Sequence, residues 1–314
     1  MTPSSGAAHP RDGVPPHVPS PWRLWMAGAR PKTLPAAIVP VLVGTAAAAD
    51  AALGGSRGVS WWRFGLAMIV ALALQVGVNY ANDYSDGVRG TDDDRVGPLR
   101  LVGSGLVPPR DVKIAAFAAF GVAALAGLAL AAATSWWLIV VGLACIAAGW
   151  FYTGGSNPYG YLGFGELFVF VFFGLVATVG STFVQTERVD GWPVVVAVPV
   201  GLLATALLVT NNLRDIPTDE ASGKRTLAVR LGDRRTRWLY VVMIVVAFLL
   251  IAVVAVGWRM PALISLLGFV VAVAPVRAVL GGASGPALIP VLAATGRLQM
   301  VAGIGLAVGL WLGA

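Results

Sequence analysis

Two groups of acidic residues stand at the ends of long apolar runs, and they are the residues of this chain best suited to chemistry. The first segment reads Asn79-Tyr-Ala-Asn82-Asp83-Tyr-Ser-Asp86, and the second reads Asn211-Asn-Leu-Arg-Asp215-Ile-Pro-Thr-Asp219. Eight of the 15 acidic residues lie within 83–94 or 215–220. Carboxylates this dense beside hydrocarbon need a partner, because burying an unpaired charge is very costly.

The spacing of the first segment fits one face of a helix. Asn79, Asp83 and Asp86 are separated by four and then three residues, so we expect all three to project from the same side if the apolar run stays helical to its end. Asn82 would lie beside them. The segment therefore predicts a convergent set of oxygen ligands.

The second segment repeats part of this pattern. Asn211 and Asp215 are four residues apart, and Asp219 would follow one turn later. Proline disfavours a helical conformation for the residue before it and removes a hydrogen-bond donor. Because Pro217 interrupts this stretch, we expect Asp219 on a kinked or unwound turn.

The partner that best suits these oxygens is magnesium. Carboxylates at a helix C-terminus add to the negative end of the helix dipole, so a bound cation is needed to offset the repulsion. Magnesium uses one or two carboxylates, keeps water ligands and completes its shell with substrate phosphates. The plain alternative, solvated loop acids, does not explain why the acids concentrate in two short segments.

Composition assigns the chain to the multi-pass membrane proteins. It is 57% hydrophobic and 12% charged, with a mean hydropathy of +0.80, whereas soluble domains are about 25% charged. The 52 residues between Lys113 and Glu166 carry no charge, enough for two helices of the roughly 20 residues that cross a bilayer. Seven further uncharged runs give nine predicted spans in an all-α protein: 33–49, 64–82, 167–186, 191–213, 238–258, 260–276 and 298–314.

The two acidic segments end the second and the sixth predicted spans, four spans apart. A pseudo-repeated four-helix unit would bring them together across a central cavity. The basic residues alternate by loop, and 18 of the 22 fall on the same side as these segments. The positive-inside rule therefore predicts that the N-terminus and both segments face the cytoplasm and that the C-terminus lies outside. This distribution of the basic residues indicates the orientation of a plasma membrane protein rather than a surface that binds nucleic acid.

Residues 1–22 differ from the rest of the chain. They are rich in Pro, Ser and Gly and lack an apolar stretch, which predicts a disordered cytoplasmic tail followed by a membrane domain over 23–314. Both histidines, His9 and His17, fall in this tail. The only cysteine, Cys145, is mid-span. Histidine or cysteine metal sites are therefore not expected in the folded region.

A basic group follows each acidic segment. Arg95 and Arg100 come after the first, and Lys224 and Arg225 come after the second. Lysine and arginine neutralise phosphate oxygens, so metal and basic groups together suit a diphosphate. No segment matches a P-loop or a GxGxxG fingerprint, so nucleotide binding has no support.

Asn82-Asp83-x-x-Asp86, Asp215-x-x-x-Asp219 and nine predicted spans resemble the UbiA superfamily of intramembrane aromatic prenyltransferases, over residues 23–314. The runs 82–100, 211–215 and 223–232 look like its MenA branch, the 1,4-dihydroxy-2-naphthoate polyprenyltransferases of menaquinone synthesis, as do 30–35 and 152–159. Two departures from the 4-hydroxybenzoate enzymes, Gly90 in place of a third aspartate and Ser156 in place of a lysine, favour the naphthoate branch.

The resemblance implies that magnesium holds a polyprenyl diphosphate and promotes cleavage of its allylic carbon–oxygen bond. The dihydroxynaphthoate ring then attacks, and carbon dioxide and a proton leave to give demethylmenaquinone. The expected catalytic residues and metal ligands are Asp83, Asp86, Asp215 and Asp219, assisted by Asn79, Asn82 and Asn211. The expected substrate contacts are Lys32, Asp92, Arg95, Arg100, Tyr152, Lys224 and Arg225.

Two alternatives compete with this interpretation. Acidic residues near membrane helices can mark the ion pathway of a transporter, although here the acids lie at span ends. Prenylation of another acceptor, such as 4-hydroxybenzoate, homogentisate or haem, would use the same diphosphate chemistry.

Overall fold

The structure is a computed structural model that describes residues 20–49, 58–91 and 99–314. Two predicted substrate contacts, Asp92 and Arg95, lie outside the described residues, as does most of the predicted N-terminal tail. Within the described ranges the chain forms helices and no strands, which confirms the predicted all-α class.

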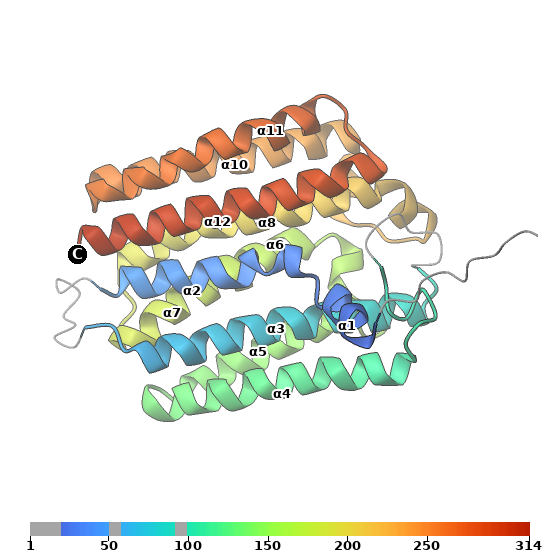
Figure 1. Cartoon of the computed structure of the whole chain (residues 1–314), viewed down its shortest axis with the longest axis horizontal. Coiled ribbons are helices and arrows are strands. Elements are labelled where there is room, and N and C mark those ends of the chain that lie inside the picture. The colour runs from blue at the N-terminus through green and yellow to red at the C-terminus, as the bar shows by residue number, and fades with distance from the viewer. Residues whose placement is uncertain (1–19, 50–57, 92–98) are drawn as a thin grey trace, which may run out of the picture.

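Long helices lie side by side along the longest axis of the molecule (Figure 1). In the described residues, seven helices are long and apolar enough to cross a membrane. Two shorter apolar helices, α2 and α5, occupy the places of the first and fourth predicted spans. The helical elements are α1 (Pro21–Ala29), η1 (Pro31–Thr33), α2 (Pro35–Ala47), α3 (Trp61–Val88), α4 (Pro109–Ala133), α5 (Trp137–Phe151), η3 (Tyr159–Leu162), α6 (Gly165–Val169), η4 (Phe170–Val176), α7 (Ala177–Thr186), α8 (Gly191–Ala221), α9 (Leu227–Leu231), α10 (Asp233–Gly257), η5 (Met260–Leu267), α11 (Gly268–Leu280), η6 (Gly285–Ala287) and α12 (Leu288–Leu312).

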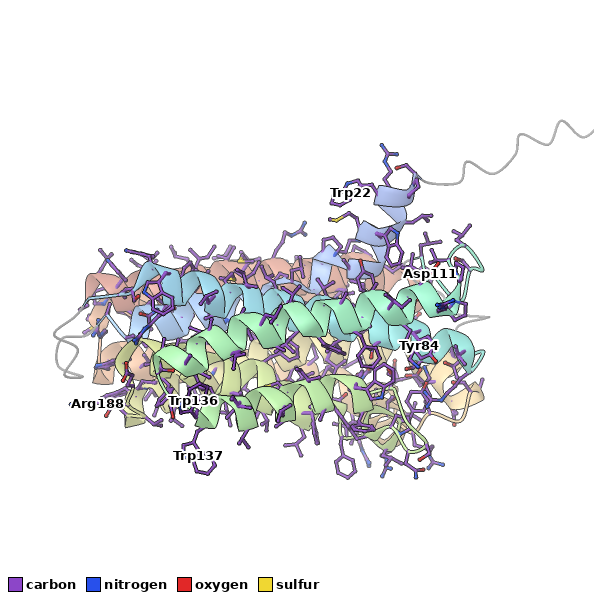
Figure 2. The ribbon with its side chains drawn as sticks, turned by 90° about the horizontal axis from the view of Figure 1, so that it is seen from below. Trp22, Tyr84, Asp111, Trp136, Trp137 and Arg188 are labelled. Carbon is purple, nitrogen blue, oxygen red and sulfur yellow. The ribbon has the colours of Figure 1, made fainter. Side chains whose placement is uncertain are left out.

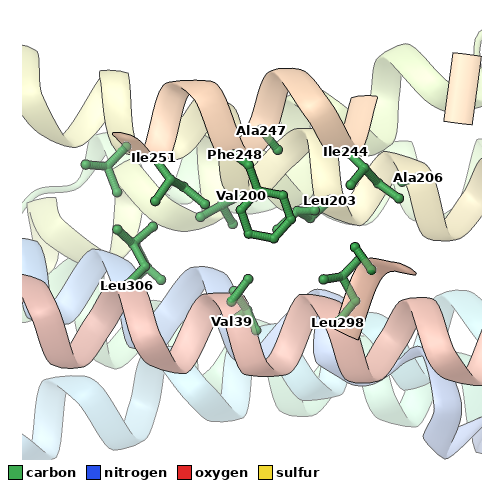
Figure 3. Close-up of a cluster of buried hydrophobic side chains, with 14 of the residues drawn as sticks. Val39, Val200, Leu203, Ala206, Ile244, Ala247, Phe248, Ile251, Leu298 and Leu306 are labelled. Carbon is green, nitrogen blue, oxygen red and sulfur yellow. The ribbon is translucent and has the colours of Figure 1, made fainter. Parts of the chain in front are cut away.

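The largest apolar core joins α8, α10 and α12 with α2. Phe248 and Ile251 of α10 face Val200 of α8 and Leu306 of α12 across this core (Figure 3). Between membrane helices, close backbone contact rather than hydrophobic burial stabilises packing, and small residues permit it. Gly44 of α2 illustrates this, since an added Cβ would lie 2.2 Å from the Thr178 carbonyl oxygen of α7.

Three helices extend beyond the uncharged runs that predicted them. The last predicted span began at residue 298, but α12 begins at Leu288 and places Arg297 at an exposed position. Helix α3 continues through Asp83 and Asp86 to Val88, and α8 continues through Pro217 to Ala221. We expected Asp219 on a kinked or unwound turn, and the unwound turn is therefore wrong. Asp219 lies within α8, whose surrounding packing outweighs the local effect of the proline.

The loops that contribute residues to the candidate site lie at one end of the bundle. The segments 99–108, 152–164 and 222–232 follow α3, α5 and α8 at this end. Helix α1 also lies here and stands out from the bundle, with Trp22 at its exposed tip (Figure 2). Trp136, Trp137 and Arg188 mark the opposite end in the same view.

Candidate functional site

A cavity of about 400 Å³ opens between α2, α3, α5, η4 and α8, below the loops at one end of the bundle. It brings together ten of the predicted site residues. These are Lys32, Asn79, Asn82, Asp86, Arg100, Tyr152, Asn211, Asp215, Asp219 and Lys224. The two acidic segments, more than 120 residues apart in sequence, therefore share a single polar site.

Helix α3 presents Asn79, Asn82 and Asp86 to the cavity, but Asp83 does not line it. The Asp83 carboxylate is fully buried and accepts the backbone N–H groups of Leu101 and Val102, both at 2.9 Å. Asp83 thus lies slightly further around the helix than the other three residues, on the side of the following loop. We expected residues 79, 83 and 86 to share the face of α3 that lines the site, but residues 79, 82 and 86 line it.

Asp86 is surrounded by donors and positive charge. Its Oδ1 accepts hydrogen bonds from Tyr161 Oη at 2.6 Å and from Lys224 Nζ at 3.1 Å. Arg100 Nη2 lies 3.5 Å from its Oδ2. The carboxyl, Arg100 and Lys224 are each nine-tenths or more buried. Two basic groups that the sequence assigned to substrate phosphates therefore meet one of the predicted metal ligands.

Tyr161 keeps its proton at this site. Burial, and then the negative charge of Asp86, raise the pKa of Tyr161 above the ordinary range of tyrosine. Its ring also lies beneath two cations, with Lys224 Nζ 4.7 Å and Arg89 Cζ 5.4 Å from the ring centroid. Tyr161 therefore acts as a donor to Asp86 and as an aromatic support for Lys224.

Helix α8 supplies the second group. Arg214 Nε donates to Asp215 Oδ1 at 2.6 Å, and its Nη2 donates to Asp215 Oδ2 at 2.8 Å and to Asn211 Oδ1 at 2.8 Å. This fork-shaped pair is buried, with Arg214 at 4% exposure. The sequence did not single out Arg214, although its place inside the acidic segment was a usable signal.

A hydrogen-bond network beside the cavity joins α3 to the segment before α2. Asn79 Nδ2 donates to the Ala29 carbonyl at 2.9 Å and to Thr33 Oγ1 at 3.2 Å, and Gln75 Nε2 also donates to Thr33 Oγ1. Between these anchor points, Lys32 lines the cavity. Asn79 therefore anchors the segment that carries Lys32.

Aromatic side chains form one wall. The rings of Tyr159 and Phe168 stack with centroids 3.9 Å apart, and Phe168 stacks on Phe172 at 5.8 Å. Tyr152 meets Tyr159 edge-on at 5.5 Å. The sequence did not single out the two phenylalanines, because apolar patterning cannot distinguish them from lipid-facing residues.

Arg225 does not line the cavity. Its backbone N–H donates to the Tyr161 carbonyl at 2.9 Å, and its side chain is exposed. The backbone of Arg225 therefore ties the loop after α8 to the loop after α5.

The donor set suits magnesium in combination with a diphosphate. Among the described residues, no group of three His, Cys, Asp or Glu side chains could hold a metal by itself. Magnesium, however, binds through one or two carboxylates and completes its shell with phosphate oxygens and water. Asp86, Asp215 and Asp219, together with the amides of Asn82 and Asn211, offer such oxygens within one cavity.

A second cavity of about 350 Å³ continues from the first. Both are lined by Ala71, Leu74, Cys145, Phe172 and Ala177. The rest of the second cavity's lining comes from α2, α3, α4, α5, η4 and α7, and is almost entirely apolar. The polar site therefore opens into a hydrocarbon-like chamber.

Comparison with known proteins connects this site to a family. Residues 38–281 match the model of the UbiA prenyltransferase family. The chain belongs to the UbiA prenyltransferase family. It is 53% identical over 279 residues to the 1,4-dihydroxy-2-naphthoate octaprenyltransferase of Mycobacterium tuberculosis, covering 88% of this chain and 93% of that protein.

Solved structures show the same fold at low sequence identity. A UbiA homologue from Aeropyrum pernix K1 superposes with a TM-score of 0.65 at 16% identity, covering 86% of this chain and 97% of that one. A UbiA homologue from Archaeoglobus fulgidus bound to GPP and Mg²⁺ gives a TM-score of 0.57 at 13% identity, covering 90% and 99%. The UbiA fold thus accounts for the helical bundle of this family member.

Proposed function

We propose that this UbiA family member transfers a polyprenyl group from a polyprenyl diphosphate to 1,4-dihydroxy-2-naphthoate in a magnesium-dependent reaction, with loss of carbon dioxide, in menaquinone synthesis. The observation that carries the proposal is the single cavity in which two oxygen-rich segments meet buried basic residues and an apolar chamber. The naphthoate acceptor is supported by the name and 53% identity of the M. tuberculosis relative.

The diphosphate would lie at the polar end of the first cavity. Asp86, Asp215 and Asp219 would hold magnesium, with Asn82 and Asn211 as further oxygen ligands. When bound, the metal would offset the negative charge that develops on the diphosphate leaving group. In the structure, Lys224 and Arg100 meet Asp86, and Arg214 meets Asp215. These cations are then placed to bind phosphate oxygens once the carboxylates engage the metal.

The allylic carbon would face the aromatic wall. Cleavage of its bond to the diphosphate leaves positive charge that water would trap, so the apolar and aromatic lining from Phe168, Phe172 and Phe173 has to exclude water. The electron-rich ring of the acceptor then forms the new carbon–carbon bond. The polyprenyl tail would extend into the second cavity.

The proposed location is a bacterial-type plasma membrane. The membrane-length helices of the described residues support a multi-pass protein. The alternation of basic residues along the chain supports a cytoplasmic N-terminus and active site, with the C-terminus outside.

A direct assay tests the function. Membranes containing the protein, given magnesium, 1,4-dihydroxy-2-naphthoate and a radiolabelled polyprenyl diphosphate, are expected to form a lipid-soluble prenylated quinol, and EDTA is expected to abolish it. Vector-only membranes and the Asp215→Ala variant at matched expression are the controls. Product with 4-hydroxybenzoate or homogentisate but not with the naphthoate would refute the acceptor, and full activity in EDTA would refute the metal.

A further inference from the structure

A buried acid beside the cavity has no part in the diphosphate chemistry. Glu166, at the start of α6, is 5% exposed, and its Oε1 accepts a hydrogen bond from Asn212 Nδ2 at 2.9 Å. Its Oε2 is buried and has no hydrogen-bond partner among the described residues. A buried carboxylate that uses only one oxygen is costly, so its presence calls for an explanation.

Glu166 fixes the orientation of the Asn212 amide. An amide can in principle present either its oxygen or its nitrogen, but a carboxylate only accepts hydrogen bonds. Glu166 therefore holds the nitrogen of Asn212, which leaves Oδ1 on the other side of the amide. Asn212 lines the cavity, and the structure gives its Oδ1 no protein donor within the described ranges. A hydrogen-bond acceptor is thus presented to the cavity.

The surroundings of this acceptor suit a flat ring. Gly165, next to Glu166, supports the Tyr152 ring, since a Cβ there would lie 3.2 Å from Tyr152 Cε2 and 3.3 Å from its hydroxyl oxygen. Beyond Tyr152 lies the stack of Tyr159, Phe168 and Phe172. An aromatic wall beside one fixed carbonyl oxygen can bind an aromatic ring by its face and a hydroxyl group by its edge.

We propose that Glu166 is a positioning residue for the aromatic acceptor: it fixes the amide of Asn212 so that Oδ1 accepts a hydrogen bond from a ring hydroxyl. This inference rests on the proposed function and adds the place and orientation of the second substrate. A hydroxyl that donates to Oδ1 gains electron density, which it passes to the ring and so favours attack on the allylic carbon. A quinone has no hydroxyl to donate, so the site selects the reduced, hydroxylated ring.

The test measures the KM of each substrate separately. In Glu166→Gln the new amide can donate, so Asn212 is free to turn and present its nitrogen to the cavity. We expect the KM for 1,4-dihydroxy-2-naphthoate to rise roughly tenfold, the effect of one lost hydrogen bond. The KM for the polyprenyl diphosphate should not change. Glu166→Asp, which keeps an acceptor-only group, should recover part of the loss.

Matched controls exclude a general effect of charge or folding. Glu220 is exposed at the same end of the bundle and does not line the cavity, so Glu220→Gln should behave as wild type. Equilibrium binding of labelled naphthoate to purified protein without diphosphate gives a readout independent of turnover. If Glu166→Gln does not fold, Asn212→Leu removes the same carbonyl and should produce the same rise in acceptor KM.

The inference and the proposed function can fail separately. An unchanged acceptor KM in Glu166→Gln, or an equal rise in the KM of both substrates, would overturn the role of Glu166 while leaving prenyl transfer intact. If the wild type prenylates a different hydroxylated ring, the naphthoate assignment fails. The same comparison of KM values with that other acceptor then decides the role of Glu166.

Discussion

Two aspartates three residues apart in α3 have different surroundings. Asp86 lies in the cavity among Lys224, Arg100 and Tyr161. Asp83 instead accepts two backbone N–H groups from the loop that carries Arg100. At the scale of the residue, the second aspartate of the motif lies at the site that we propose for the diphosphate, and the first holds the loop that carries Arg100.

This division predicts different outcomes for two isosteric variants. Asp86→Asn is expected to lower kcat by at least about 100-fold, because under the proposed function it removes a charge that would hold the metal. It should also lower thermal stability, because the buried Lys224 and Arg100 lose their counter-charge. Asp83→Asn is expected to lower the free energy of unfolding by about 1–3 kcal/mol, since one buried N–H loses its acceptor. Thermal unfolding in detergent and turnover at saturating substrate measure both. A loss of kcat in Asp83→Asn as large as that in Asp86→Asn would contradict this assignment.

Tyr161 gives a prediction on pH. Because its pKa is raised by burial and by Asp86, the phenol stays protonated as the pH rises through the usual tyrosine range. Tyr161→Phe should therefore lower activity about threefold to tenfold through the lost hydrogen bond, without changing the shape of the pH profile up to pH ~9.5. A high-pH decline present in wild type and absent in the variant would show that Tyr161 titrates there.

At the scale of the element, the shape of the chamber depends on where glycines lie. Gly142 of α5 and Gly180 of α7 line the second cavity, and a Cβ added at either would meet no atom within 4 Å. Their missing side chains leave the space that we assign to the polyprenyl tail. Other glycines, such as Gly44, serve close helix packing instead.

Filling this space tests the position of the tail. Gly142→Leu and Gly180→Leu are expected to lower kcat/KM for a long polyprenyl diphosphate by about tenfold or more, because the added side chain displaces part of the tail. Turnover of geranyl diphosphate should change little. Gly121→Leu is the matched control, since Gly121 is exposed on α4 and lines neither cavity. A loss shared equally by short and long substrates would place the tail elsewhere.

At the scale of the whole molecule, the polar residues of the cavity come from the ends of α3 and α8 and from the loops beside them. The loop between α7 and α8 lies at the opposite end of the bundle (Figures 1 and 2). The alternation of basic residues supports our proposal that the first end faces the cytoplasm. The diphosphate would then enter from the cytoplasmic face while its tail stays at membrane depth.

Cysteine labelling tests this orientation. In a Cys145→Ser background, Val189→Cys and Ser222→Cys place single exposed thiols at opposite ends of the bundle. A membrane-impermeant maleimide applied to right-side-out vesicles should label the first variant at once and the second only after permeabilisation. The reverse pattern would invert the topology.

The sequence alone was sufficient for the fold class, and ten of the residues that it predicted for the site line one cavity. Uncharged runs mark membrane helices because a charge is costly in hydrocarbon, and oxygen ligands beside basic residues indicate a metal–diphosphate site. Helix ends were less predictable. Arg297 and Asp86 both lie inside helices. The prediction assumed that a charged side chain is too costly within a membrane helix. Arg297 is exposed and Asp86 is paired with Lys224, so neither residue carries that cost.

Only the tertiary structure decided which polar side chains meet. Asp83 and Asn82 are adjacent in sequence, yet Asp83 faces a loop and Asn82 faces the cavity, and that depends on how α3 is rotated against its neighbours. Glu166 precedes an apolar run, and the sequence did not predict a role for it. The structure shows that Asn212, 46 residues later, donates a hydrogen bond to it. Long-range hydrogen bonds of this kind leave no local periodicity, so no pattern of spacing could have revealed them.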